Sequence, residues 1–191
     1  MTEGRERRSA GTPATTALAR AGVAHELRPY RHDPGATSYG LEAATALGVP
    51  PEQVFKTLLA KVDGRLVVAV VPVSGSLDLK ALAAAVGGKR AEMAEVAEAE
   101  RSTGYVVGGI SPLGQRKALP TVVDETATAF DSVLVSALRR GLDVSLAPDD
   151  LVGLTGARVS PIDRSLSRSK IVRDEARRLA GRFAAERRER S

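Results

Sequence analysis

Residues 54–73, VFKTLLAKVDGRLVVAVVPV, carry the pattern that decides the fold. Two apolar runs rich in β-branched side chains, 54–62 and 65–73, flank Asp63-Gly64, a dipeptide that favours the tight turn of a β-hairpin. The second run is apolar on both faces, which indicates a central strand covered on both sides. Its eight residues from 66 to 73 fall far short of the roughly 20 that a membrane-spanning helix needs. This stretch therefore predicts a hairpin at the centre of a buried sheet.

Helices and further strands are predicted on both sides of this hairpin. Thr12-Pro13 and Ser38 are typical of helix starts, and the glycines at 22 and 48 are typical of helix ends. The other predicted elements are an edge strand at 25–31, a helix at 79–86 capped by Asp78, a short strand inside a structured loop at 102–120, strands at 121–123, 133–135 and 142–144, and a helix at 148–154. The pattern predicts a mixed α/β protein.

The composition limits the domain organisation. The chain has 191 residues, of which 43% are hydrophobic and 3% aromatic, so we expect one domain with a core of Ala, Val and Leu. We predict a disordered leader at 1–11, the domain at 12–162 and a basic, helical extension at 163–191. The absence of cysteine excludes disulfides and thiolate metal sites. The leader lacks the apolar stretch of a signal peptide, which favours a cytoplasmic protein without a membrane partner.

The net charge of +5 is unevenly distributed. Residues 163–191 carry 10 Lys/Arg and 5 Asp/Glu, so they account for the whole excess, and the remainder is neutral. A neutral body argues against a protein that grips DNA along its length. A basic extension could instead contact the phosphates of an RNA, although a packed helix or a solubilising end explains the same residues equally well.

Several kinds of catalytic centre have no counterpart in the sequence. His25 and His32 are the only histidines, and no HExxH, GxSxG, Walker A or strand-linked GxGxxG pattern occurs. Three Tyr, three Phe and no Trp offer little for stacking on nucleic-acid bases. We therefore expect neither a metal nor an organic cofactor, and an enzyme of this kind would depend on positioning and on fixed hydrogen-bond donors.

Two features stand out as candidate site residues. Lys56 lies near the start of an apolar strand, where it is either a strand-end lysine with its ammonium in water or a cation at the mouth of a pocket. The segment 104–114, GYVVGGISPLG, is either a turn-rich connection or a loop whose backbone N–H groups face a ligand.

Other candidates are weaker. Asp143 lies between apolar neighbours, where it is either a charge on the solvent face of a strand or part of a site. Ser136 ends a predicted strand, and Tyr30 is equally compatible with a rim aromatic whose hydroxyl is in water. His32 is interpreted as a loop histidine.

A set of motifs in fixed order is more specific than any one of them. In sequence they are HDP, VFKTL, a strand ending in PV, LDLK, RSTGYVVGGISPLGQ, LPTVVDE and RGLD. With these motifs, residues 12–160 resemble the YbaK/EbsC family of aminoacyl-tRNA deacylases, most closely its Cys-tRNA(Pro) deacylase branch. The family is related to the editing domain of bacterial prolyl-tRNA synthetases.

The resemblance implies a fold, an activity and a substrate. The fold is a single α/β domain with a curved, mixed, barrel-like sheet flanked by helices. The activity is removal of a wrong amino acid from tRNA(Pro), in which the cysteine thiol attacks its own ester, so the product forms by hydrolysis or as a thiolactone. Misacylated tRNA(Pro) is the implied partner, with prolyl-tRNA synthetase as a second. Two alternatives stay open, an Ala-tRNA(Pro) deacylase and a non-catalytic module that binds aminoacyl-tRNA or a synthetase.

The resemblance also assigns roles to individual residues. Lys56, Gly108 and Asp143 match the family's catalytic positions. The matched substrate-binding positions are Tyr30, Thr57, Gly109, Pro112 and Ser136. No role is implied for Tyr39 or for the residues after 162.

Overall fold

The computed structural model describes residues 11–137 and 140–164. The leader predicted at 1–11 and the helix predicted at 163–191 lie almost entirely outside these residues. The helices are α1 (Pro13–Ala21), α2 (Tyr39–Leu47), α3 (Leu79–Ala85), α4 (Val96–Thr103) and α5 (Pro148–Thr155), with 3-10 turns at Pro51–Gln53 and Glu125–Ala129. The strands are β1 (His25–Pro29), β2 (Val54–Val62), β3 (Arg65–Pro72), β4 (Ala91–Met93), β5 (Thr121–Asp124), β6 (Val133–Ser136), β7 (Leu142–Leu146) and β8 (Arg158–Ser160).

The predicted hairpin is confirmed as β2 and β3. The strands pair antiparallel from Phe55 opposite Pro72 to Val62 opposite Arg65. Both turn residues have positive φ, 48° at Asp63 and 83° at Gly64, which is the conformation that matches the twist of a tight hairpin. From Val67 onward β3 is buried on both faces, as its continuous apolar run predicts.

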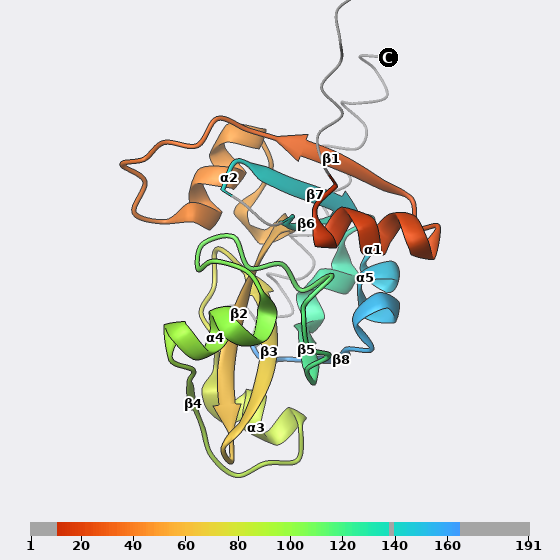
Figure 1. Ribbon diagram of the computed structural model, residues 1–191. Coiled ribbons are helices and arrows are strands. Elements are labelled where there is room, and N and C mark those ends of the chain that lie inside the picture. The colour runs from red at the N-terminus through yellow and green to blue at the C-terminus, as the bar shows by residue number, and fades with distance from the viewer. Residues whose placement is uncertain (1–10, 138–139, 165–191) are drawn as a thin grey trace, which may run out of the picture.

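All eight strands of the described residues belong to one mixed sheet. Its order is β1-β7-β6-β2-β3-β5-β8, with β4 added beside β2. Parallel pairs join β2 to β6, β3 to β5 and β5 to β8, and the other pairs are antiparallel. Figure 1 shows β1 and β7 crossing one end of the long β2–β3 hairpin at a steep angle, so the sheet is strongly curved. The predicted mixed α/β class is confirmed.

The edge of β2 that faces away from β3 is only partly paired with other strands. Its first two residues pair with β6, and Ala60 to Val62 pair with β4. Within the described part of the chain, no strand pairs with residues 56–59 on that edge. The sheet therefore has a gap beside its longest strand, and the candidate functional site lies at this gap.

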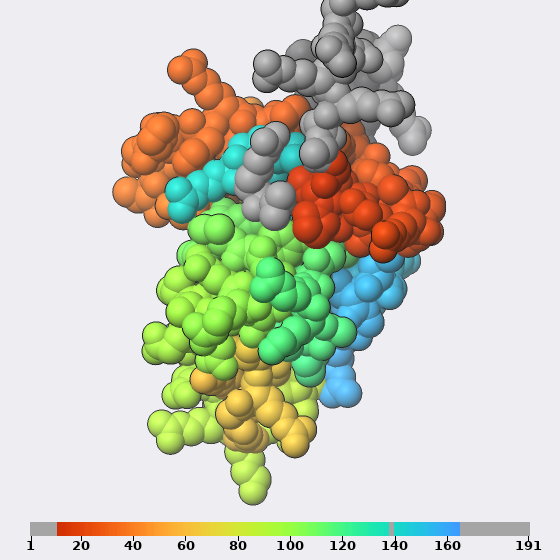
Figure 2. All heavy atoms as spheres, viewed as in Figure 1, coloured from red at the N-terminus to blue at the C-terminus, as the bar shows by residue number. Residues whose placement is uncertain are grey.

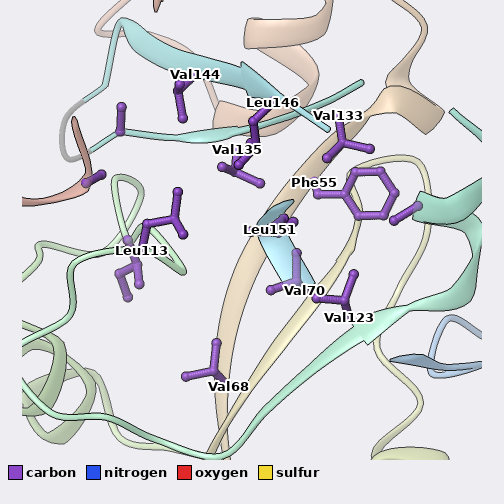
Figure 3. Close-up of a cluster of buried hydrophobic side chains, with 14 of the residues drawn as sticks. Phe55, Val68, Val70, Leu113, Val123, Val133, Val135, Val144, Leu146 and Leu151 are labelled. Carbon is purple, nitrogen blue, oxygen red and sulfur yellow. The ribbon is translucent and has the colours of Figure 1, made fainter. Parts of the chain in front are cut away.

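The core is built largely of Val, Ala and Leu. Figure 3 shows buried side chains of β2, β3, β5, β6 and β7 gathered in one cluster, including Phe55, Val70 and Val123. On the same face, α4 and the loop after it cover the hairpin, as the green atoms of Figure 2 show. This loop is held by Tyr105, whose buried hydroxyl donates to Leu113 O at 2.5 Å.

Several details of the predicted fold differ from the structure. The short strand expected within 102–120 does not form, because α4 continues to Thr103 and the remaining residues are tied by turns and by Tyr105. The sequence analysis did not predict β8, whose three residues pair with β5 after a crossover through α5. Ser38 does occupy the position before α2, but its side chain makes no capping hydrogen bond.

Candidate functional site

A cavity of about 370 Å³ lies at the gap in the sheet. Every residue from Val54 to Leu59 lines it. Successive side chains of a strand point to opposite faces, so six consecutive residues can line one cavity only if the strand is approached at its edge. The cavity therefore extends around the open edge of β2 and has walls on both faces of the sheet.

Lys56 lines this cavity, as the pocket interpretation of the sequence predicts. Its Nζ donates to the Gly75 carbonyl at 2.7 Å. Burial lowers the pKa of Lys56, and the charge of Asp163 opposes that effect. The ammonium is thus partly desolvated. It has three N–H donors and the Gly75 carbonyl accepts from one of them, so it retains donors for a ligand.

The loop that holds Lys56 is fastened by a network that sequence reasoning missed. Asp163 accepts from the amide of Ser76 at 2.7 Å. The amides of Ile162 and Asp163 in turn donate to Asp124 Oδ2, each at 2.8 Å. A Cβ on Gly75 would collide with the Asp163 carboxylate, so glycine is required there. No local signal reveals this network, because its partners are 87, 38 and 39 residues apart in the sequence.

Asp143, Ser136 and Tyr30 lie together at another wall of the cavity. Asp143 on β7 is directly opposite Ser136 on β6, and all three residues line the cavity. The Asp143 side chain is buried, and burial raises its pKa to about 6. Burial also raises the pKa of Tyr30. The interpretation of Asp143 as a charge on the solvent face is therefore wrong, since 4% of the residue is exposed.

The substitution Asp143→Asn is expected to stabilise the fold at pH 7.5 by about 1–3 kcal/mol, because a rise in pKa from 3.8 to about 6 corresponds to a cost of that order for the charged form. The folded-state pKa is raised, so the wild type loses stability as pH rises through 4–6. The gain in the variant should therefore disappear near pH 3.5. Urea unfolding at both pH values measures it, with exposed Asp131→Asn as the control. A variant less stable than wild type at pH 7.5 contradicts this prediction.

Gly108 lines the cavity from the loop after α4. Its φ is +89°, and a Cβ there would lie 2.8 Å from the Tyr39 ring and 3.0 Å from Arg140 Nε. Among described residues, the Gly108 amide has no hydrogen-bond partner. The loop thus brings a free backbone donor to the cavity, as its glycine content suggests.

The other predicted loop residues lie differently. Gly109 and Pro112 are buried and do not line the cavity. The Gly109 amide donates to Val106 O at 2.9 Å, which closes a turn and shapes the loop around Gly108. A direct role of either residue in substrate binding stays a prediction.

Thr57 lines the cavity on the strand edge, next to Lys56. Its Oγ1 is the only buried side-chain polar atom of the described residues that has no hydrogen-bond partner. Such an atom is unusual in a folded protein and calls for an explanation.

Two further residues, at or beside the cavity, received no role in the sequence analysis. Tyr39 lines the cavity, and the Arg140 guanidinium lies 4.1 Å from the centre of its ring. Arg140 also donates to Val107 O at 3.4 Å, so it joins the two sides of the opening. His32 is bound to Glu42 at 3.0 Å and packs near Tyr39, in a supporting position outside the cavity lining. A tyrosine at a helix start and an arginine in a loop give no sequence signal of their own.

The described residues contain no group of three or more His, Asp or Glu side chains placed to hold a metal ion. None of the helices within 11–137 and 140–164 is long and apolar enough to cross a membrane.

Comparisons with known proteins agree with the motifs. Residues 32–154 match the aminoacyl-tRNA editing domain family. A relative from Enterococcus faecalis, "Putative Cys-tRNA(Pro)/Cys-tRNA(Cys) deacylase EbsC", is 40% identical over 121 residues, which are 62% of this chain and 73% of the relative.

Solved structures show the same fold. A "putative trans-editing enzyme for prolyl tRNA synthetase" is 26% identical with a TM-score of 0.72, and the match covers 82% of this chain and all of that one. A hypothetical protein is 25% identical with a TM-score of 0.72 over 80% of this chain and 99% of its own. By its motifs, its fold and these matches, the chain belongs to the aminoacyl-tRNA editing domain (YbaK) family.

Proposed function

We propose that this protein is an editing deacylase that removes mischarged cysteine from tRNA(Pro), with the thiol of the substrate as the nucleophile. The observation that carries the proposal is the set of chemical groups that line the cavity. A free backbone donor, a partly desolvated ammonium and a buried carboxyl line it, at Gly108, Lys56 and Asp143. Neither His25 nor His32 lines it, so a serine or threonine there has no histidine base beside it.

The chemistry can be written with the substrate supplying the attack. The cysteine sulfur forms a bond to its own ester carbonyl, and the carbonyl oxygen becomes an oxyanion. The carbon–oxygen bond to the ribose then breaks, the thiol proton passes to the departing ribose oxygen, and the β-thiolactone so formed is hydrolysed by water. The ester is already activated and a thiol has a pKa of about 8.5, so the protein needs to orient the substrate and stabilise charge.

Each candidate residue has a defined task in this scheme. The Gly108 amide donates to the oxyanion, a contact worth roughly 2.7–4 kcal/mol in other enzymes. Lys56 acts as a point charge that holds the ribose or the terminal phosphate in register. Asp143 faces the α-ammonium of the substrate, and that cation would compensate the buried carboxylate. Tyr30, Thr57 and Ser136 complete the walls that contact the aminoacyl group.

The partners follow from the substrate. We expect the protein to act in the cytoplasm on misacylated tRNA(Pro), and to work beside prolyl-tRNA synthetase because residues 1–162 carry no net positive charge with which to hold free tRNA. The basic residues after 163 are candidates for contact with tRNA phosphates.

The test is a set of matched substrates. Cys-tRNA(Pro) should lose its amino acid at least about 100-fold faster than Ser-tRNA(Pro), because serine is nearly isosteric but its hydroxyl is a far weaker nucleophile than a thiol. Deacylation rates are measured with each substrate with and without protein. A rate for Cys-tRNA(Pro) equal to the uncatalysed rate contradicts the proposal. Equally fast loss from Ala-tRNA(Pro) selects the alanine deacylase, and tight binding without turnover selects a binding module.

A further inference from the structure

The unpaired edge of β2 exposes backbone groups to the cavity. The amide of Val73 on the β3 side donates to Val54 O at 2.8 Å, and the amide of Ala94 on the opposite side donates to Leu59 O at 3.0 Å. In a strand, the N–H and C=O of one residue point to the same side, and the side alternates along the chain. The backbone groups of Thr57 therefore point to the same side as those of Leu59, away from β3.

That side is where the sheet has its gap. Phe55 is the last residue of β2 that pairs with β6, and Ala60 is the first that pairs with β4. Thr57 lies midway, so its N–H and C=O have no strand opposite them among the described residues. An edge of this kind is a ready acceptor for one more extended segment.

The side chain of the same residue gives a second, independent sign. Thr57 Oγ1 is buried without a partner, although buried polar atoms are nearly always satisfied. One residue thus contributes an unpaired hydroxyl together with an unpaired backbone donor and acceptor, all at the wall of one cavity.

We infer that the edge at Thr57 binds the aminoacyl group as a one-residue β-strand, an inference that rests on the function proposed above. The Thr57 N–H donates to the ester carbonyl oxygen, and the Thr57 C=O accepts from the α-ammonium, whose other hydrogens stay free for Asp143. These are the groups with which an added strand binds a sheet edge. Every α-aminoacyl ester has them, so this edge recognises the common part of the substrate and the cavity walls select the side chain.

Amide hydrogen exchange tests the inference on the wild-type protein. The probe is 3′-cysteinylamino-3′-deoxyadenosine, in which an amide replaces the cleavable ester. In the free protein, the Thr57 amide should exchange faster than the Leu58 amide, which faces β3, by about 100-fold or more. Saturation with the probe should slow exchange at Thr57 by about 10-fold or more and leave Leu58 unchanged. The matched ligand 3′-amino-3′-deoxyadenosine, which lacks the aminoacyl group, should give no such protection.

Each outcome has one meaning. If the protein deacylates Cys-tRNA(Pro) and binds the probe, but exchange at Thr57 does not slow, this inference is wrong and the proposed function stands. If the protein neither deacylates the substrate nor binds the probe, both are wrong. The variant Thr57→Pro removes the N–H at an unpaired edge, where proline is tolerated, and Thr57→Val removes only the hydroxyl. A folded Thr57→Pro variant that binds the probe as tightly as Thr57→Val also overturns the inference.

Discussion

Replacing Lys56 with alanine is expected to lower the rate of Cys-tRNA(Pro) deacylation by about 100- to 1,000-fold, the usual effect of removing one well-placed charge or donor from a reaction site. The ammonium of Lys56 is partly desolvated and lies against the carbonyl of Gly75 at the cavity wall. In such a site the charge is poorly screened and its attraction for a phosphate or a polarised oxygen is stronger than in water.

The fold should survive this change. Lys56→Ala removes one charge-assisted hydrogen bond, worth about 1.5–3 kcal/mol, from a total stability of about 5–15 kcal/mol. Lys61 on the same strand supplies the matched control, because its ammonium pairs with Glu98 at 2.6 Å and it does not line the cavity. Single-turnover deacylation of both variants, with circular dichroism to confirm folding, measures the difference. Equal rates for Lys56→Ala and Lys61→Ala would remove Lys56 from the mechanism.

The sequence predicts most of the sheet because its signals are local. The Asp63-Gly64 turn sets the register of β2 and β3 through contacts between near neighbours. Helix starts and ends are equally local, and the glycines after α1 and α2 have the positive φ that ends a helix. The motif set adds the family, which the comparisons confirm.

What the sequence could not predict depends on long-range packing. The gap beside Thr57 exists because β6 and β4 pair with different parts of the same edge of β2 and do not meet. Both strands are distant in the sequence, since β4 begins at Ala91 and β6 at Val133. The support of Lys56 by Gly75 and Asp163 likewise joins segments 87 residues apart, and Tyr39 meets Arg140 across the opening. No periodicity or turn signal records such pairings, so candidate residues could be named from the sequence but their arrangement could not.

Replacing Gly108 with alanine is expected to lower the deacylation rate by about 100-fold or more, through displacement of the backbone donor that faces the cavity. The φ of +89° is strained for alanine, and the new Cβ would lie 2.8 Å from the Tyr39 ring, closer than real contacts allow. The new Cβ would also lie 3.0 Å from Arg140 Nε, and Arg140 is stacked on the Tyr39 ring, so a shift of either neighbour disturbs that stack. The loop must therefore move, and its amide moves with it.

Gly153→Ala is the matched control for this variant, because an added Cβ there meets nothing within 4 Å. In the interior of α5 the exchange should stabilise the protein by about 0.5–1 kcal/mol and leave the rate unaltered. The contrast separates a general effect of removing a glycine from loss of one donor at the cavity. If the Gly108→Ala protein deacylates Cys-tRNA(Pro) as fast as the Gly153→Ala protein, the oxyanion is stabilised elsewhere. In that case the unpaired N–H of Thr57 becomes the donor that the reaction uses.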